Sequence, residues 1–350
     1  MVKKAKSRKS RSSSNSNSNS NSNSLISQDY FSSQIDININ EVFPVVVMAT
    51  MSSGKSTLIN ALLGEQLLPS RNVACTAKVY SVLDDDRETE TSIYITDSSG
   101  KTIEKRKNII EELEKANSDN NISHILIRGH VRGVLNTDKA LLLIDTPGTN
   151  NSRDDSHEKI TMDILKKIKG GVLLYVLNAT QFAINDDKAL LDRAVEFAKK
   201  NKKVSLLFVL NKVDQIDEEK EESVEKSVLS VQDYLISSGI KEPQIIPISA
   251  LAASLFKKVI NGESLTRSEY RSFIDYYEIY KPKDFNMRSF ACTKELKEQH
   301  KEIEVRGEKY TIGDLNRAIE NCGMKLLEEE IQKAQILSSG AINNKIRIRK

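Results

Sequence analysis

The chain has 350 residues, which is long enough for one large domain or two small ones with a substantial core. Hydrophobic residues make up 39% of it and charged residues 29%, and no apolar run approaches the roughly 20 residues of a membrane helix. Six of the 52 basic residues lie within the first eleven positions, so the rest of the chain, with all 49 acidic residues, is slightly acidic and offers no electrostatic case for nucleic-acid binding.

The N-terminal segment, residues 1–38, is basic at first and then nearly all Ser and Asn from Ser12 to Ser24. Such a composition cannot bury enough apolar surface to offset the entropy of ordering, so we predict that residues 1–38 are disordered. No apolar secretory signal follows the basic stretch, and the three cysteines show neither metal-ligand nor disulfide spacing. We therefore expect a reducing, cytoplasmic setting.

Short, β-branched apolar runs then recur along the chain, separated by helical patterns such as residues 187–200. The runs are Val42–Met48, Ala77–Leu83, Leu141–Ile144, Val172–Leu177, Val204–Leu210 and Gln244–Ile248. This rhythm predicts an α/β fold with a doubly wound, mostly parallel sheet and helices on both faces. Residues 84–138 interrupt the rhythm, with a turn expected at Ser98–Gly100, and we interpret them as an insertion.

Directly after the first run, residues 49–57 read A-T-M-S-S-G-K-S-T and open a helical segment, as a Walker A phosphate loop does. The backbone N–H groups of such a loop wrap phosphates, while Lys55 neutralises the β and γ oxygens and Ser56 binds Mg²⁺. The predicted nucleotide-binding residues here are Ala49, Thr50, Met51, Ser52, Ser53, Gly54, Lys55, Ser56 and Thr57. Ala49 stands where the consensus has glycine, and Met51 is bulky for a position near the γ-phosphate, so weak catalysis stays open as an alternative.

The sequence D-T-P-G, Asp145 to Gly148, follows the third run and places a carboxylate at the carboxyl end of a central strand. We expect Asp145 to hold Mg²⁺ through water and the Gly148 N–H to contact the γ-phosphate. Thr76, just before the second run, is the candidate switch threonine, which would bind Mg²⁺ and place the attacking water; the alternative is a strand-edge threonine. Ser56, Thr76 and Asp145 are thus the predicted metal ligands.

The sequence N-K-V-D, Asn211 to Asp214, follows the fifth run and predicts which base is bound. A carboxylate at Asp214 can accept hydrogen bonds from N1 and N2 of guanine, whereas adenine offers no such pair of donors. Lys212 is expected to lie across the base, and Asn211 to tie this loop to the phosphate loop. Ser249 and Ala250, after the sixth run, are expected to direct the Ala250 N–H at guanine O6. Together the motifs predict binding of GTP and GDP.

The region after these motifs is less regular. Residues 256–310 are charged and rich in tyrosine, and we interpret them as an insertion whose structure the pattern does not define. Within residues 311–338, apolar residues at helical spacing predict one long amphipathic helix that closes the domain; they are Leu315, Ile319, Leu326, Leu327 and Ile331. Residues 339–350 form a second basic tail.

With these residues assembled, the chain resembles a dynamin-family GTPase of the bacterial dynamin-like type, and the resemblance covers the G domain at residues 39–255. It rests on M-S-S-G-K-S-T-L-I-N-A-L-L-G at 51–64, L-L-P-S-R-N-V-A-C-T at 67–76, D-T-P-G and N-K-V-D, with a weaker echo at 322–327. The resemblance implies Mg²⁺-dependent hydrolysis of GTP to GDP and phosphate.

It also implies how the reaction is catalysed. Thr149 stands where small GTPases carry a water-orienting glutamine. Members of this family instead pair G domains face to face, and the residue matched by Ser52 helps to hold a monovalent cation, K⁺ or Na⁺. On this analogy Ser52, Lys55 and Thr76 carry catalysis, completed by dimerisation.

Three functions remain open at this point. The first is a GTPase activated by G-domain dimerisation, and the second is a slow GTP-dependent switch or assembly factor. The third is a weakly catalytic partner of a larger dynamin-like protein, because few residues follow the last motif for a stalk. The expected partner is accordingly a second copy or a different chain. The basic tails offer peripheral contact with an anionic membrane, or only solubilise the chain.

Overall fold

The computed structural model describes residues 24–49, 52–68, 78–88, 90–107, 109–130, 139–147, 155–181, 188–216, 223–282 and 301–338. Within them, a nine-stranded sheet has the strand order β4-β3-β5-β2-β6-β1-β7-β8-β9. Its strands are β1 (Val42–Ala49), β2 (Val79–Asp84), β3 (Ser92–Asp97), β4 (Thr102–Lys105), β5 (Ile122–Gly129), β6 (Ala140–Asp145), β7 (Gly171–Asn178), β8 (Val204–Asn211) and β9 (Ile245–Ile248). The helices are α1 (Lys55–Leu63), α2 (Ile109–Ser118), α3 (Asp155–Lys167), α4 (Lys188–Lys200), α5 (Val224–Ser237), α6 (Ala250–Ile260), α7 (Arg267–Tyr280), α8 (Ile312–Asn321) and α9 (Met324–Ser338).

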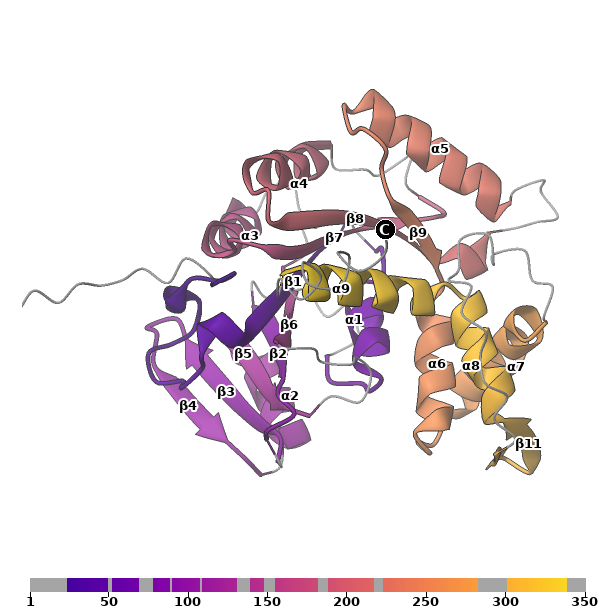
Figure 1. Cartoon of the computed structure of the whole chain (residues 1–350). Coiled ribbons are helices and arrows are strands. Elements are labelled where there is room, and N and C mark those ends of the chain that lie inside the picture. Colours follow the sequence, from indigo (N-terminus) through magenta and orange to yellow (C-terminus); the bar gives the residue numbers. More distant parts are fainter. Residues whose placement is uncertain are drawn as a thin grey trace, which may run out of the picture.

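The central part of the sheet is parallel. β1 pairs with β6 on one side and β7 on the other, and β8 and β9 continue the parallel order. In Figure 1, α3 and α4 lie on one side of β7 and β8, and α1 and α9 lie on the other. Every residue of β1 and of β7 is buried, because helices cover both faces of these strands. The predicted doubly wound α/β fold is therefore confirmed.

The region between β2 and β6 extends the same sheet. β2 is antiparallel to β6 and parallel to β5, and β3 and β4 add two antiparallel strands at the outer edge. The segment at residues 84–138, interpreted as an insertion, thus contributes strands to the main sheet, together with α2. Gly100 turns the chain between β3 and β4 with a φ of 86°, at the turn that the sequence predicts.

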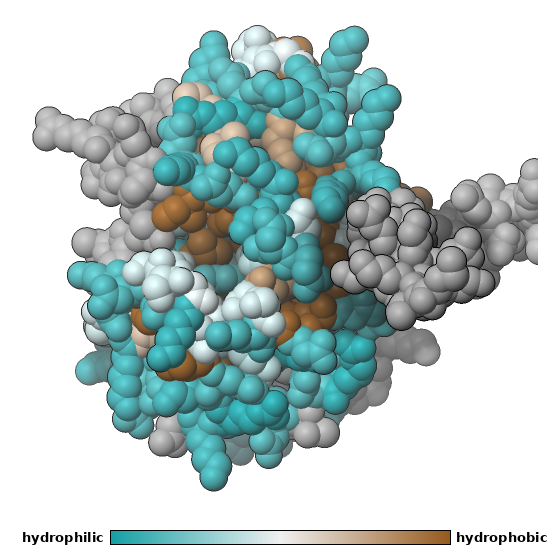
Figure 2. Space-filling model, turned by 90° about the vertical axis from the view of Figure 1, so that its left-hand side faces the viewer, coloured by the Kyte–Doolittle hydropathy of each residue, from teal (hydrophilic) through white to brown (hydrophobic). Residues whose placement is uncertain are grey.

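The N-terminal segment corrects one prediction. Residues 24–38, expected to be disordered, pack against the domain: Ile26 is fully buried and forms a β-bridge with Ile168. Other buried side chains of this segment are Leu25, Tyr30, Phe31, Ile35 and Ile37. The prediction was wrong because disorder, expected from the Ser/Asn-rich composition up to Ser24, was also assigned to residues 25–38, which contain enough large apolar residues to be buried. Figure 2 looks at the side of the molecule that carries this segment and β4, where the outer surface is mostly hydrophilic. Residues 1–23 lie outside the described part.

Helices α6, α7 and α8 pack together beyond the sheet and beside α1. The expected boundary at residues 255 and 256 falls inside α6, so the described part of residues 256–310 is continuous with the main domain. α7 begins with a capping box in which Thr266 and Glu269 bond each other's backbone N–H groups. Phe256 of α6 and Phe273 of α7 are both buried and pack edge to face, 5.9 Å between ring centroids. β10 (Glu302–Val305) and β11 (Glu308–Thr311) form a hairpin before α8.

The closing helix is two helices rather than one. The helix is interrupted at Gly323, which has a φ of 82°. Gly323 lies so close to β9 that a Cβ there would be 2.1 Å from the Pro247 carbonyl oxygen. The amphipathic pattern spans the break because both helices bury one face: Leu315 and Leu327 are each fully buried. Among the described helices, none combines the length and apolarity that crossing a lipid bilayer requires.

Candidate functional site

The sequence motifs meet at the carboxyl edge of the parallel strands. β1 and β6 are in register with Val47 opposite Asp145, and β7, β8 and β9 align Asn178, Asn211 and Ile248. Because parallel strands end at the same edge, the loops that follow β1, β6, β8 and β9 are neighbours. The site is therefore an assembly of loops that are far apart in the sequence.

The phosphate loop follows β1, whose last residue, Ala49, is buried. Ser52 is exposed and has a φ of 56°, and Ser53 beside it is 1% exposed. Gly54 has a φ of 82° and precedes α1, whose free N–H groups and helix dipole favour an anion. A Cβ on Gly54 would lie 2.6 Å from Asn211 Nδ2, so this position requires glycine for space as well as for conformation.

The first turn of α1 places three polar side chains beside the end of β6. Lys55 Nζ forms an ion pair with Asp145 Oδ1, and Ser56 Oγ lies 3.5 Å from Asp145 Oδ2. The Lys55 and Asp145 side chains are only 13% and 8% exposed. The hydroxyl and carboxylate oxygens of Ser56 and Asp145 are hard donors of the kind that Mg²⁺ prefers, so these residues fit the predicted metal. Thr57 follows on α1 and is half-buried.

Four predicted site residues lie outside the described part of the chain: Thr50, Met51, Thr76 and Gly148. The last described residues before Thr76, Leu67 and Leu68, are hydrogen-bonded to α1. Asn60 of α1 accepts hydrogen bonds from the backbone N–H groups of Leu67 and Leu68, at 3.1 and 2.8 Å, and donates to the Leu68 carbonyl oxygen at 2.8 Å. The side chain of Asn60 is buried, so α1 holds the residues that lead to the candidate switch segment.

Asn211, the last residue of β8, connects three of the loops. Its Nδ2 donates to the Ser53 carbonyl oxygen at 2.7 Å, and its Oδ1 accepts from the Ala250 N–H at 3.0 Å. The predicted tie from Asn211 to the phosphate loop is present. The Ala250 N–H, however, was expected to point at guanine O6, and in this structure it is bound to Asn211 instead, because both groups are buried side by side. Ser249 caps α6 by accepting from the Ala252 N–H at 3.2 Å.

The residues expected at the base lie in the turn after β8. Lys212 has a φ of 67°, and its Cε is 3.8 Å from the position of a Cβ built on Gly54, so its side chain runs beside the phosphate loop. Asp214 lies in a short 3₁₀ helix, Val213–Gln215, and its carboxylate is partly exposed. The Tyr276 hydroxyl of α7 donates to Asp214 Oδ2 at 3.1 Å.

Two residues at this edge were missed by sequence reasoning. Asn178 ends β7 and donates from Nδ2 to the Ser52 carbonyl oxygen at 3.4 Å, while its Oδ1 accepts from the N–H and hydroxyl of Thr180. Its position directly after an apolar run was a signal that could have indicated it. Tyr276 is the other, and no local pattern distinguishes it from the neighbouring tyrosines.

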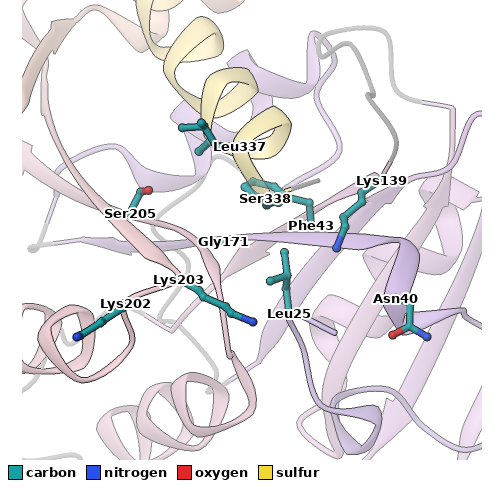
Figure 3. Close-up of a pocket in the computed structure, with 11 residues that line it drawn as sticks. Leu25, Asn40, Phe43, Lys139, Gly171, Lys202, Lys203, Ser205, Leu337 and Ser338 are labelled. Atoms are coloured by element: carbon teal, nitrogen blue, oxygen red, sulfur yellow. The ribbon is translucent and has the colours of Figure 1, made fainter. Parts of the chain in front are cut away.

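A cavity of about 690 Å³ lies at the opposite edge of the sheet. It is lined by residues at the amino ends of the strands, such as Phe43 and Gly171. Lys139 and Lys203 extend toward Leu25 from two sides (Figure 3). Burial, and the charge of Lys203, lower the pKa of Lys139. This cavity contains none of the motif residues, so the candidate site is the loop assembly at the carboxyl edge.

Comparison with known proteins places this assembly in a family context. Residues 45–213 match the sequence model of a family described as "Dynamin family". The "Bacterial dynamin-like protein" of Nostoc punctiforme is 25% identical over 189 residues, which cover 51% of this chain and 26% of that protein. The "Dynamin-like protein 1" of Campylobacter jejuni is 25% identical over 311 residues, which cover 75% of this chain and 41% of that protein.

The chain thus spans less than half the length of these two relatives. A solved structure described as an oligomerised bacterial dynamin pair is 21% identical, with a TM-score of 0.47, over 85% of this chain and 43% of that chain.

Proposed function

We propose that this chain is a Mg²⁺-dependent GTPase whose activity rises when two G domains pair. The match of residues 45–213 to the dynamin-family model supports the proposal. The observation that carries the proposal is the position of Asn211. It joins the phosphate loop at Ser53 to the loop at Ala250, in the turn that also contains Asp214. The loops proposed to recognise the phosphates and the base are thereby joined through one side chain.

Guanine is the base that Asp214 would select. Its carboxylate is partly exposed beside Lys212, and a carboxylate accepts from the two adjacent donors of guanine, whereas adenine lacks this pair. Lys212 would cover the base with its aliphatic stem. If adenine were bound, the Asp214 carboxylate would be left without donors, and this cost to the binding free energy would exceed that of merely losing a favourable contact.

Ser56 and Asp145 would hold Mg²⁺, with Thr76 as a further ligand. The ion would neutralise charge on the phosphate oxygens when it is bound. Lys55 would then exchange part of its interaction with Asp145 for the β and γ oxygens at the N-terminus of α1. In hydrolysis, a water oxygen bonds to the γ-phosphorus and the bond to the bridging oxygen breaks. The products are GDP and inorganic phosphate, and the water proton passes to phosphate or solvent.

Pairing of G domains is proposed because Ser52, in the phosphate loop, is exposed and could contact a partner chain. Ser52 is exposed at a positive-φ turn of the phosphate loop, with its carbonyl oxygen toward Asn178. A partner chain could complete a site there for a monovalent cation, K⁺ or Na⁺, and supply positive charge to the transition state. Gly148 would contribute its N–H to the γ-phosphate. The partner would be a second copy or a related chain.

The test is GTP hydrolysis with Mg²⁺ and K⁺ across a range of protein concentrations, beside Lys55→Ala and an ATP control. Specific activity that climbs with concentration, disappears in Lys55→Ala and is absent with ATP supports the proposal. Tight GTP binding with flat, slow turnover would replace it with the second candidate, a GTP-dependent switch or weakly catalytic partner, which Ala49 and Met51 favour.

Peripheral membrane contact through the basic residues between Lys3 and Arg11 is a separate part of the proposal. Each basic residue near an anionic surface contributes about 1 kcal/mol, so the cluster could hold the chain at a membrane. Co-sedimentation with anionic vesicles should fall when these residues are replaced by serine. Unchanged sedimentation would leave the tail with a solubilising role only.

A further inference from the structure

Helix α7 places two tyrosines against the two loops expected to recognise the base. Tyr276 and Tyr280 are one turn apart, with 6.5 Å between their ring centroids. The Tyr276 hydroxyl donates to Asp214 Oδ2 at 3.1 Å, and the side chain of Ser249 lies near the Tyr280 hydroxyl and opposes the rise in the pKa of Tyr280 that burial causes. One helix therefore contacts both the turn after β8 and the turn after β9.

The packing of α7 leaves these tyrosines little freedom. Tyr280 is 1% exposed, and its carbonyl oxygen accepts from Asn321 Nδ2 of α8 at 2.7 Å. Phe273, on the same helix, is fully buried against α6. At the other end of the helix, Glu269 forms a 2.7 Å ion pair with Lys258 of α6. The position of the Tyr276 hydroxyl is thus set by the packing of three helices rather than by a loop.

The chemistry of the pair makes Tyr276 a donor. Burial, and the negative charge of Asp214, raise the pKa of Tyr276, so the hydroxyl keeps its proton at any physiological pH. A carboxylate has about four acceptor positions. Asp214 Oδ2 can therefore accept from Tyr276 while both carboxylate oxygens keep lone pairs for two donors on a base. The Tyr276 hydrogen bond restricts rotation of a carboxylate that is otherwise partly exposed.

We propose that Tyr276 is a positioning residue for guanine: it orients the Asp214 carboxylate so that both oxygens meet the base. The inference rests on the proposed function, since it assigns a specificity element to the same site. The 256–310 region, which contains α7, then has a role in nucleotide selection.

The test is the Tyr276→Phe variant, which removes only the hydroxyl. Tyr277→Phe is the matched control, because Tyr277 is next in sequence and packs its ring on Phe273 and Tyr310 at 5.9 and 5.0 Å. Dissociation constants are measured for GTP and for ITP, which lacks the 2-amino group of guanine. We expect Tyr276→Phe to weaken GTP binding about tenfold, as for a hydrogen bond to a charged group, and ITP binding less. Tyr277→Phe should leave both constants unchanged.

Steady-state kinetics separate positioning from a general loss of structure. A positioning role predicts a higher KM for GTP with kcat retained, and a smaller preference for GTP over ITP. Equal weakening of GTP and ITP binding in Tyr276→Phe, or no change in GTP binding, would overturn the inference. Tighter GTP binding would also overturn it, because Tyr276 would then compete with the base for Asp214. The wild-type protein in the same titration tests the proposed function, which fails if the wild type does not bind GTP. If the wild type binds GTP and Tyr276→Phe binds it with the same affinity, only the inference about Tyr276 is rejected.

Discussion

Asn211 Nδ2 donates to the carbonyl oxygen of Ser53 at 2.7 Å, across 158 positions of sequence. The same side chain accepts from the Ala250 N–H, so one buried amide holds the phosphate loop, the turn after β8 and the start of α6. A small displacement of any of the three would be transmitted to the other two, because the amide is enclosed and cannot find water as a substitute partner.

Replacing Asn211 with alanine should therefore harm both folding and nucleotide binding. It leaves the Ser53 carbonyl and the Ala250 N–H without their partner in a buried place, which should cost on the order of 2–4 kcal/mol of unfolding free energy. GTP and GDP affinity should both fall. Asn261→Ala is the control, since Asn261 Nδ2 makes a similar 2.7 Å bond to the Gly64 carbonyl at the far end of α1. That variant should lose stability in urea titrations and keep its nucleotide affinity; equal affinity loss in both would contradict the role of Asn211.

The Gly54→Ala variant tests the close contact between the phosphate loop and Asn211. The φ of 82° makes alanine unfavourable by about 1–2 kcal/mol, and the new Cβ would also meet Asn211 Nδ2 at 2.6 Å. Gly100→Ala shares the positive φ, at 86°, but meets nothing within 4 Å. We expect Gly54→Ala to be destabilised by about 1–3 kcal/mol more than Gly100→Ala and to lose nucleotide binding. Similar melting temperatures for the two variants would refute this explanation.

Gly323→Ala should weaken the junction of α8 and α9. Its Cβ would stand 2.1 Å from the Pro247 carbonyl oxygen, in backbone that cannot swing aside as a flexible side chain would. Gly307→Ala, with a φ of 89° in the β10–β11 turn and open space around it, provides the control. Chemical denaturation should show a larger loss for Gly323→Ala, by about 1–3 kcal/mol. The Cys322 carbonyl oxygen, next to Gly323, accepts from the Ser249 N–H at 3.0 Å. A shift at Gly323 should therefore displace the turn after β9 and weaken recognition of the base as well.

His124 predicts a loss of stability at mildly acidic pH. Burial, with the nearby Lys167 charge, lowers the pKa of His124 from 6.5 to about 4, and its Nε2 lies 2.9 Å from Ser81 Oγ. Between pH 6.5 and 4 the unfolded chain binds a proton that the folded chain does not, so stability present above pH 6.5 is lost as the pH falls. His124 as a whole residue keeps some exposed surface, so we expect on the order of 1–3 kcal/mol. His124→Gln should flatten the pH dependence of urea unfolding over this window; an identical slope would exclude His124 as its source.

Several features of the fold were predictable because they are written in local patterns. The strand ends at Asp145 and Asn211 follow from apolar runs that stop at a polar residue, and the structure has both residues at the carboxyl edge. The candidate site residues between Ser52 and Thr57 were predicted from a loop that needs specific residues at fixed spacing. The packing of residues 24–38 and the break at Gly323 did not follow, since each depends on what lies opposite: Ile168 in the first case and Pro247 in the second.

The sequence by itself determined the order of the motifs and predicted the parallel core of the sheet. Both predictions rest on patterns within short segments, namely the motif spacings and the alternation of apolar runs with helical patterns. Only the tertiary structure decided which partners the motif residues have. Tyr276 reaches Asp214 across 62 positions, and Ala250 donates to Asn211 instead of facing outward. Contacts of this kind arise from the packing of α6, α7 and α8 against the sheet, where shape and burial rather than local periodicity select the partner.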